Sequence, residues 1–241
     1  MSHSLPVTID ADLRTRWTRD WALPPSAIDR LLEAAVYRTY PPRTAILPQG
    51  SSRSTVFFLL RGEVSVSVYL PDGRRVLCAL YQPGTIFGFP LVDKERPRWS
   101  SADAFTEATL ALIPRAAFER VVHTLPPATV AEFFNRLLMR QARFAMRLLH
   151  CMVLDLPGRL ALAFIELAEA FGRHTPEGLQ LTLPLTHEHL AEMVGASRER
   201  VSKAMAEFAH QGWIRYGRRS ITVCDLDAIR QAASPRTNPL A

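Results

Sequence analysis

Residues 126–154 keep one helical hydrophobic period from end to end, and this feature constrains the fold more than any other. The period has the 4-3 spacing of helices that pack on a second helix, so it predicts one long helix. A second apolar row (Phe133, Leu138, Ala145, Met152) gives that helix two faces to bury, one on its own domain and one on a partner. The alternative is a core helix inside a monomer. We expect a homodimer whose interface consists of Val130, Phe134, Leu137, Gln141, Phe144 and Leu148.

The segments on either side of this helix differ in their residue patterns, so they predict different secondary structure. Residues 44–113 form short β-like runs separated by glycine and proline, which is typical of a jelly-roll barrel, and the best hairpin signal is the turn Pro71-Asp72-Gly73. A short helix is expected before them, over 24–35. Leu156-Pro157-Gly158 breaks the long helix, and short helices follow. The fold class is therefore α+β, with a barrel at 1–125, a dimerisation helix and hinge at 126–155, a second domain at 156–233 and a disordered tail at 234–241.

Two short helices around a glycine turn lie in the second domain. Thr186 is a good N-cap for the first helix, Gly195-Ala196 forms the turn, and Ser197 can cap a second helix over 198–210. Residues 172–178 are expected to be a polar connector, and a short strand follows at 179–183. Residues 213–223 alternate as a β-hairpin. This arrangement predicts a winged helix-turn-helix.

The charges of this domain suit double-stranded DNA. The chain carries 29 Lys and Arg against 23 Asp and Glu, which favours a polyanionic partner. Arg198 can pair with a guanine edge and Glu199 can accept from cytosine N4. Basic residues at the tip of the hairpin can neutralise phosphates. A solvated charged helix face is the alternative. The candidate DNA-binding residues are Ser197, Arg198, Glu199, Arg200, Lys203, Arg218 and Arg219.

Other classes of protein find little support. The three cysteines are far apart and form no disulfide framework, which favours a reducing compartment. Residues 1–20 lack an apolar run and no stretch reaches the length of a membrane span, so we expect a cytoplasmic protein. His187-Glu188-His189 lacks the later histidine of a metalloprotease motif, since Ala191 stands there. We expect no enzyme and no metal.

The sequence resembles the CRP/FNR regulators over nearly its whole length. The segment 194–201, VGASRERV, is similar to the family's V-G-x-S-R-E-x-V, and LD at 154–155 with GRLA at 158–161 is similar to its hinge. The resemblance implies a homodimer that reads a palindrome through Arg198, Glu199 and Lys203, with RNA polymerase as a further partner. Lys203 stands where one branch of the family has Arg. The ammonium group of lysine is a point charge, so it distinguishes guanine from other bases less well than the bidentate guanidinium of arginine does.

The effector pocket departs from the pattern of the family's cyclic-nucleotide-binding members. Phe89 follows Gly88 where a glutamate would contact ribose, and Trp99 replaces the serine after Arg98. Buried polar groups of cyclic AMP would stay unpaired there, so we expect it not to bind. An iron-sulfur cluster is not expected, because the three cysteines are spread too far along the chain to supply its thiolates. Haem is not expected either, because only Cys78, His123 and His3 are available as an axial ligand at the barrel. Two interpretations remain open: a small organic effector, or a filled pocket in an effector-independent, architectural DNA-binding protein. The candidate pocket residues are Phe89, Arg98, Trp99, Phe144 and Ala145.

Overall fold

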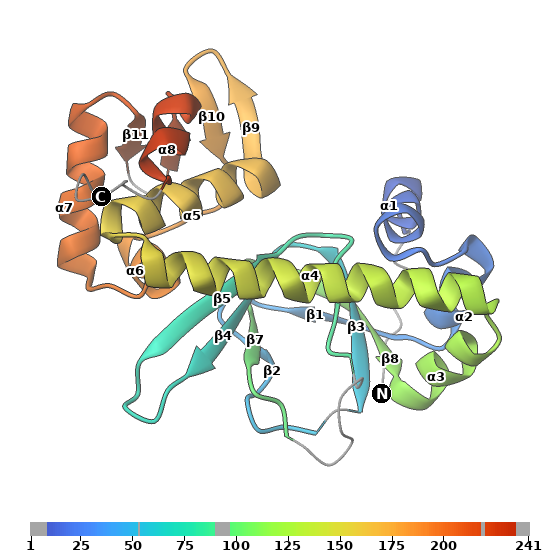
Figure 1. Ribbon diagram of the computed structural model, residues 1–241. Helices are drawn as coiled ribbons and strands as arrows, with labels where there is room; N and C mark the ends of the chain where they lie inside the picture. Colours follow the sequence, from blue (N-terminus) through green and yellow to red (C-terminus); the bar gives the residue numbers. More distant parts are fainter. Residues whose placement is uncertain (1–8, 53, 90–96, 218–219, 235–241) are drawn as a thin grey trace, which may run out of the picture. The chain divides into compact units, whose positions relative to one another are not determined.

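The computed structural model describes residues 9–52, 54–89, 97–217 and 220–234. It divides into two compact units, Met1–Ala142 and Arg143–Ala241, shown in Figure 1. The division falls inside the long helix, whereas the sequence analysis placed the domain boundary near Asp155. A helix can stay continuous while its packing partners change, so the end of a helix and the boundary of a compact unit need not coincide. Of the predicted disordered tail, all but Ser234 lies outside the described residues.

The first unit is a β-sandwich preceded by two helices, α1 (Ala11–Trp21) and α2 (Pro25–Glu33). One sheet has the order β1-β8-β3-β6 and the other β2-β7-β4-β5, and every paired neighbour is antiparallel. This is the predicted jelly-roll, and the hairpin turn at 71–73 joins β4 to β5. The strands are β1 (Val36–Tyr40), β2 (Ala45–Leu47), β3 (Thr55–Arg61), β4 (Val64–Tyr69), β5 (Arg75–Tyr81), β6 (Ile86–Phe87), β7 (Ser101–Ala104) and β8 (Ala108–Pro114).

Strand β3 explains how this unit is layered. Phe57 and Leu59 point into the core between the two sheets, where they meet Val64 and Leu110. Alternate residues of β3, such as Phe58, point the opposite way, into a second core made with the helices. Because successive side chains of a strand face opposite sides, a strand buried on both faces needs an unbroken apolar run, and this strand has one.

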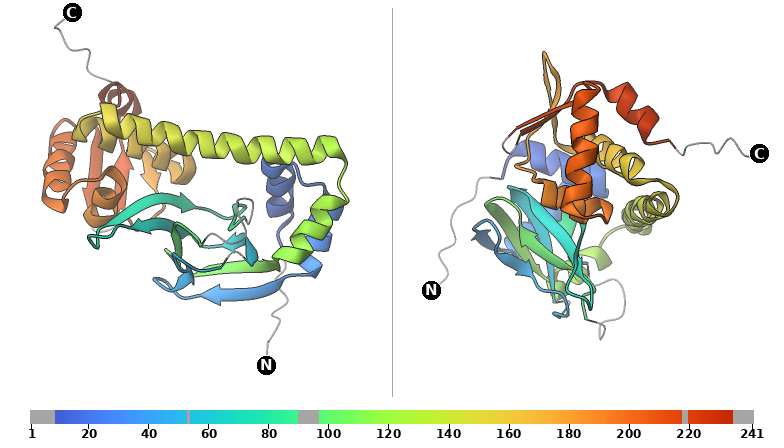
Figure 2. Two further views of the ribbon diagram at one scale, coloured as in Figure 1. Left: turned by 60° about the horizontal axis from the view of Figure 1, so that its bottom comes forward. Right: turned by 90° about the vertical axis from the view of Figure 1, so that its left-hand side faces the viewer.

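The helices cover the outer face of the sheet that contains β3. Helix α1, which the sequence analysis did not predict, buries Trp17 completely, and the Trp17 ring lies 5.1 Å from the ring of Phe58. Two further helices follow the last strand, α3 (Arg115–His123) and α4 (Pro127–Val153). Helix α4 is the long helix that the heptad period predicted. The views in Figure 2 show it running without a break.

The second unit holds the end of α4 and the elements that follow it. Asp155 caps α5 (Leu156–Phe171) by accepting a hydrogen bond from the backbone N–H of Gly158 at 2.9 Å, and Pro157 occupies the first turn. The predicted polar connector at 172–178 is largely a hairpin instead: it holds β9 (Gly172–Thr175) and the first residue of β10. The remaining elements are β10 (Gly178–Leu181), α6 (His187–Val194), α7 (Arg198–His210), β11 (Ile214–Gly217), β12 (Ser220–Val223) and α8 (Leu226–Ala232).

Candidate nucleic-acid interface and pocket

Helices α6 and α7 are set by their caps and by the turn between them. The Thr186 hydroxyl accepts from the backbone N–H of His189 at 3.2 Å, and the His189 ring accepts from the backbone N–H of Thr186 at 3.3 Å. Gly195 ends α6 with φ +63°, a conformation that strains other residues, and nothing fills the space where a side chain would stand. The Ser197 hydroxyl caps α7 by accepting from Arg200. Each of these local signals was readable in the sequence.

One face of α7 is buried and the rest is free. Val201, Met205 and Phe208 are at most 3% exposed, so the helix is held against the unit's own core. The polar residues predicted to bind DNA are exposed at its N-terminal end: Ser197, Arg198, Glu199, Arg200 and Lys203. A helix anchored on one side with a free polar first turn can enter a major groove.

Glu199 is prepared to act as a hydrogen-bond acceptor. Its own backbone N–H and the Ser197 hydroxyl donate to the carboxylate, and Arg198 adds a favourable charge, so the pKa of Glu199 lies below its ordinary value. The ionised carboxylate suits the donor N4 of cytosine. The hairpin predicted as the wing is present as β11 and β12, whereas its tip residues Arg218 and Arg219 lie outside the described residues.

His187 links three elements of this unit, a role that the sequence analysis missed. It is the first residue of α6, its Nδ1 lies 2.7 Å from the Ser202 hydroxyl on α7, and its ring makes an edge contact with Tyr216 of β11 at 5.5 Å. The sequence carried no signal for this contact, because the three residues come together only through the tertiary fold.

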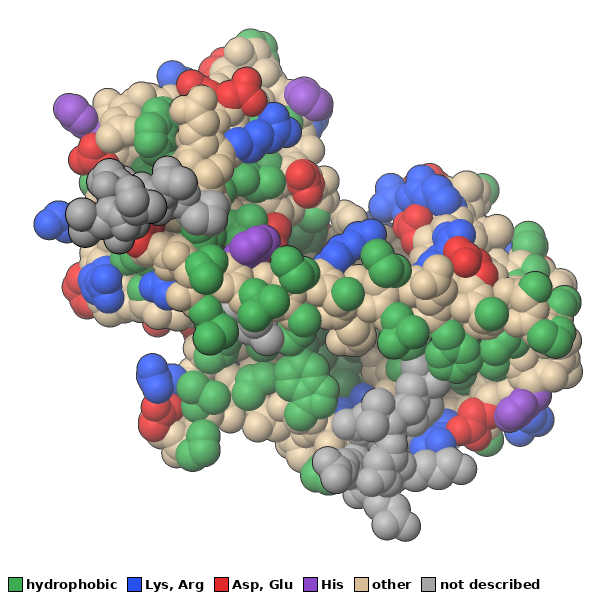
Figure 3. All heavy atoms as spheres, in the orientation of Figure 1, with side chains coloured by type: hydrophobic (Ala, Val, Ile, Leu, Met, Phe, Trp, Pro, Cys, Tyr) green, Lys and Arg blue, Asp and Glu red, His purple; other side chains and the backbone are tan. Residues whose placement is uncertain are grey.

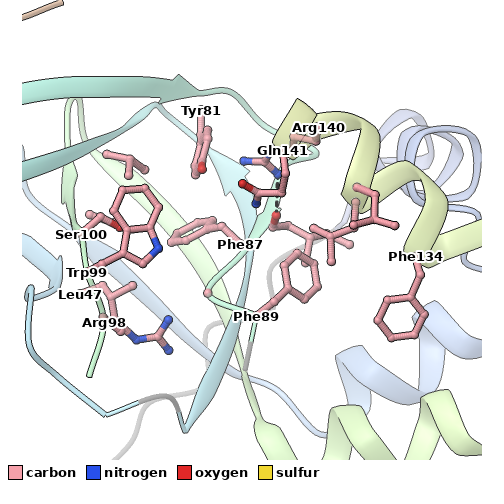
Figure 4. A pocket seen from close by; sticks show the side chains of 16 residues that line it. Leu47, Tyr81, Phe87, Phe89, Arg98, Trp99, Ser100, Phe134, Arg140 and Gln141 are labelled. Carbon is pink, nitrogen blue, oxygen red and sulfur yellow. Dashed lines mark hydrogen bonds between the residues drawn. The ribbon is translucent and has the colours of Figure 1, made fainter. Parts of the chain in front are cut away.

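A pocket of about 550 Å³ lies in the first unit (Figure 4). Strands, the segment before β7 and helix α4 supply its walls. Its polar lining residues are Arg98, Ser100, Arg140 and Gln141. Its apolar and aromatic lining includes Leu47, Val66, Tyr81, Ile86, Phe87, Phe89, Trp99, Ala102, Phe134, Leu137 and Leu138.

Three of the five predicted pocket residues line this cavity: Phe89, Arg98 and Trp99. Phe144 is half-buried and Ala145 is exposed, and neither is part of the lining. Arg98 is 7% exposed and donates to the backbone carbonyls of Ser52 and Thr55 at 3.0 and 3.1 Å. The sequence analysis missed Arg140 of α4. Its position three residues after Leu137, on the same helical face, was the available signal.

The structure describes the side chains of five of the six residues predicted for the dimer interface, and three of the five lie at the pocket. Phe134, Leu137 and Gln141 line the pocket, and Leu137 is only 9% exposed within the core of the first unit. Val130 is half-buried. The side chain of Leu148 lies outside the described residues. Part of the heptad row thus lines the pocket of its own domain, and its role in a dimer stays a prediction.

Two structural findings bear on other classes of site. Among the described residues, no group of three or more His, Cys, Asp or Glu side chains is placed to hold a metal ion. In that same part of the chain, no helix is both long and apolar enough to cross a membrane.

Comparisons with known proteins agree with this architecture. Residues 37–124 match the cyclic nucleotide-binding domain family and residues 158–232 match the Crp-like helix-turn-helix domain family. A CRP-like cAMP-activated global transcriptional regulator of Mycobacterium tuberculosis is 32% identical over 87% of this chain and 93% of its own. The global nitrogen regulator of a Synechocystis strain is 27% identical over 81% of this chain and 88% of its own.

Solved structures show the same fold. A CRP/FNR-family regulator from Thermus thermophilus aligns with a TM-score of 0.68 and 26% identity over 83% of this chain and 99% of its own. The c-di-GMP-responsive regulator CLP of Xanthomonas campestris aligns with a TM-score of 0.72 and 21% identity, again over 83% of this chain and 99% of its own.

The sandwich with its pocket and the winged helix-turn-helix define a DNA-binding transcription regulator with an effector-binding domain. The chain belongs to the CRP/FNR family of these regulators. The resemblance and the fold class expected from the sequence are therefore confirmed.

Proposed function

We propose that this regulator acts as a homodimer on a palindromic operator, and that a small organic effector other than cyclic AMP controls its affinity for DNA. The observation that carries the proposal is an uncovered apolar row on α4, in a chain whose DNA-reading helix is also free. Contact with RNA polymerase at the promoter is the further step that the family membership suggests.

The uncovered row supports the homodimer. Leu138, Leu149 and Met152 are 66%, 53% and 81% exposed, and Ala142 and Ala145 between them are also exposed. Their spacing is 4-3-4-3, so they form one stripe along α4. Figure 3 shows apolar side chains gathered along this helix. A second copy of the same stripe is a self-complementary partner for it. We call these five residues the α4 stripe.

Two-fold symmetry leads to the form of the operator. A dimer related by such an axis presents two copies of α7, and each one reads the same sequence in the opposite direction. The half-sites should then lie about one helical turn apart, roughly 34 Å. Arg198, Glu199 and Lys203 are the proposed base readers. Arg218 and Arg219 of the wing are the proposed phosphate contacts.

The pocket supports an effector other than cyclic AMP, although the Mycobacterium tuberculosis relative is named as cAMP-activated. Phe89, which stands in place of the ribose-binding carboxylate, packs between Trp21 at 5.5 Å and Phe133 at 5.7 Å. Trp99, in place of the phosphate-binding serine, is 54% exposed and offers a ring to the cavity. The ribose 2′-hydroxyl of cyclic AMP would lose a partner at Phe89, and that loss opposes binding.

A second candidate function is an effector-independent DNA-binding scaffold. The aromatic cluster around Phe89 favours it, because those rings already fill part of the domain. The remaining cavity of about 550 Å³ lies within the range of small-molecule sites, which supports the effector.

Two experiments test the proposal. The operator is first selected from random DNA, and gel shifts then measure affinity for it with and without each member of a metabolite panel. We expect a palindrome and at least one compound that changes affinity. An affinity that no compound changes would support the scaffold. Calorimetry with cyclic AMP is the second experiment: micromolar binding together with stronger operator binding would contradict the proposed effector class.

A further inference from the structure

Arg140 is a cation on the pocket wall that the structure holds firmly in place. Its guanidinium lies 4.4 Å from the centre of the Tyr81 ring and 5.3 Å from that of Trp21. Its Nη1 donates to the backbone carbonyl of Ile86 at 2.9 Å. Strands β5 and β6 and helix α1 thus fix a side chain that comes from α4, and Figure 4 shows it beside Gln141 and Tyr81. Stacking on two rings orients the planar group without neutralising its charge.

Arg140 has no carboxylate partner in the described part of the chain. Its side chain is half-buried, and a cation withdrawn from water is costly when no anion accompanies it. A guanidinium has five N–H donors, and the carbonyl of Ile86 takes one of them. The remaining donors can bind two oxygen atoms of a carboxylate in the fork geometry that arginine prefers.

The charge of the whole pocket points in the same direction. Arg98, the second guanidinium of the lining, is 7% exposed. The lining residues that the structure describes include neither Asp nor Glu. The charge of Arg140 therefore faces described lining residues that include no carboxylate, and such a site favours an anion.

The apolar lining of the pocket indicates which non-ionic group the anion should carry. Tyr81 and Phe87 both line the cavity, with ring centroids 5.4 Å apart, so one side of the cavity is aromatic. Phe57 of the core stacks on Phe87 at 5.1 Å and supports this side. Leu47, Ile86 and Leu137 continue the apolar lining. A ring without further polar groups fits such a wall, whereas each hydroxyl of a sugar would require a partner of its own.

We propose that the pocket binds an organic anion with an apolar ring, and that its carboxylate pairs with Arg140. This inference rests on the proposed function, since it names the chemical class of the effector. It also supplies a route to regulation. Leu138 belongs to the α4 stripe and also lines the pocket, as Arg140 does. The ligand site and the α4 stripe therefore share the same helix, and a shift of α4 reaches both.

The test uses the full-length protein and matched pairs of probes. The probes are benzoate, cinnamate, 1-naphthoate and cyclohexanecarboxylate, each with its neutral primary amide, and calorimetry and thermal shift measure binding. We expect at least one carboxylate to bind and its amide to bind about 10- to 100-fold more weakly, as the loss of a charge-assisted pair implies. Amides that bind as well as their acids, or a panel of acids that all fail to bind, would overturn the proposal.

Variants separate the role of Arg140 from general charge. Arg140→Gln should weaken carboxylate binding about 10- to 100-fold and leave the amide unchanged, and Arg140→Lys should recover part of the loss. Arg120→Gln removes the same charge from an exposed position on α3 and should have no effect. The melting temperature without ligand shows whether each variant folds. Equal effects of the Arg140 and Arg120 substitutions would reject the pairing.

Failure of this inference can be told apart from failure of the proposed function. Operator binding is measured separately by gel shift, without any carboxylate. If another class of compound changes operator affinity while every ring carboxylate fails, the effector class is wrong and the regulator remains. If the protein selects no operator from random DNA, the proposed function itself is contradicted.

Discussion

Leu137 and Leu138 are neighbours on α4, yet Leu137 is 9% exposed and Leu138 is 66% exposed. One residue turns an α-helix by about 100°, so adjacent leucines can belong to different faces. Leu137 packs in the core of the first unit, whereas Leu138 begins the α4 stripe. The packed face of α4 therefore passes into its exposed face at these two residues, both of which line the pocket.

The first prediction places a charge in the α4 stripe. Leu149→Glu should convert the dimer to a monomer at micromolar concentration, because dimerisation would bury an unpaired carboxylate. Sedimentation velocity measures the change. Operator affinity should fall with it, since a monomer has one recognition helix.

Met139 supplies the matched control for this experiment. It has the same 53% exposure as Leu149 but is not part of the stripe. Met139→Glu should leave the dimer intact. A wild-type protein that sediments as a monomer, or a Met139 variant as disruptive as the Leu149 variant, would contradict the proposed interface.

The sequence predicted α4 itself, but not every residue of α4 that lines the pocket. Period and length identified a long helix, because amphipathic spacing depends only on helix geometry. Leu137 and Leu138 both lie in apolar rows, and choosing the inward row requires knowing what the sandwich presents. Arg140 illustrates the same limit: an arginine on an apolar face looks like an interruption until Tyr81 and Trp21 are seen to stack on it.

The helix-turn-helix was predictable because its determinants are local. The Thr186 cap, the left-handed Gly195 and the Ser197 cap each act within a few residues along the chain. Contacts between distant segments had no such signal. Helix α1 was missed for this reason: its role depends on the packing of Trp17 against Phe58, far along the chain.

The second prediction concerns Trp17. It is completely buried, so Trp17→Ala should destabilise the first unit by about 3–5 kcal/mol. Its indole N–H is buried without a hydrogen-bond partner in the described part of the chain. Trp17→Phe removes this unsatisfied donor and should cost much less. Thermal or urea unfolding followed by near-UV circular dichroism compares the two variants, and equal losses would show that the ring volume is not what matters.

The third prediction concerns base reading by Arg198. Arg198→Ala should cost about 1–3 kcal/mol on the selected operator and far less on random DNA, because a bidentate guanine contact is lost. Arg198→Lys keeps the charge without the fork, so it should keep affinity for random DNA and still lose discrimination. Fluorescence anisotropy with both DNAs at one fixed salt concentration measures the two effects. Equal losses on operator and random DNA would assign Arg198 to phosphate instead.

The fourth prediction concerns the contact between His187 and Ser202, whose atoms Nδ1 and Oγ are 2.7 Å apart. This bond joins the start of α6 to the recognition helix, and the edge contact of His187 with Tyr216 extends the link to the wing strand. Ser202→Ala should weaken operator binding by about 0.5–1.5 kcal/mol, the usual contribution of one hydrogen bond. Base preference should not change, because the pair orients α7 and is not a proposed base reader. Ser202→Thr keeps the hydroxyl and should restore affinity. If the alanine and threonine variants bind the operator equally well, or if the alanine variant selects a different operator, the positioning role is wrong.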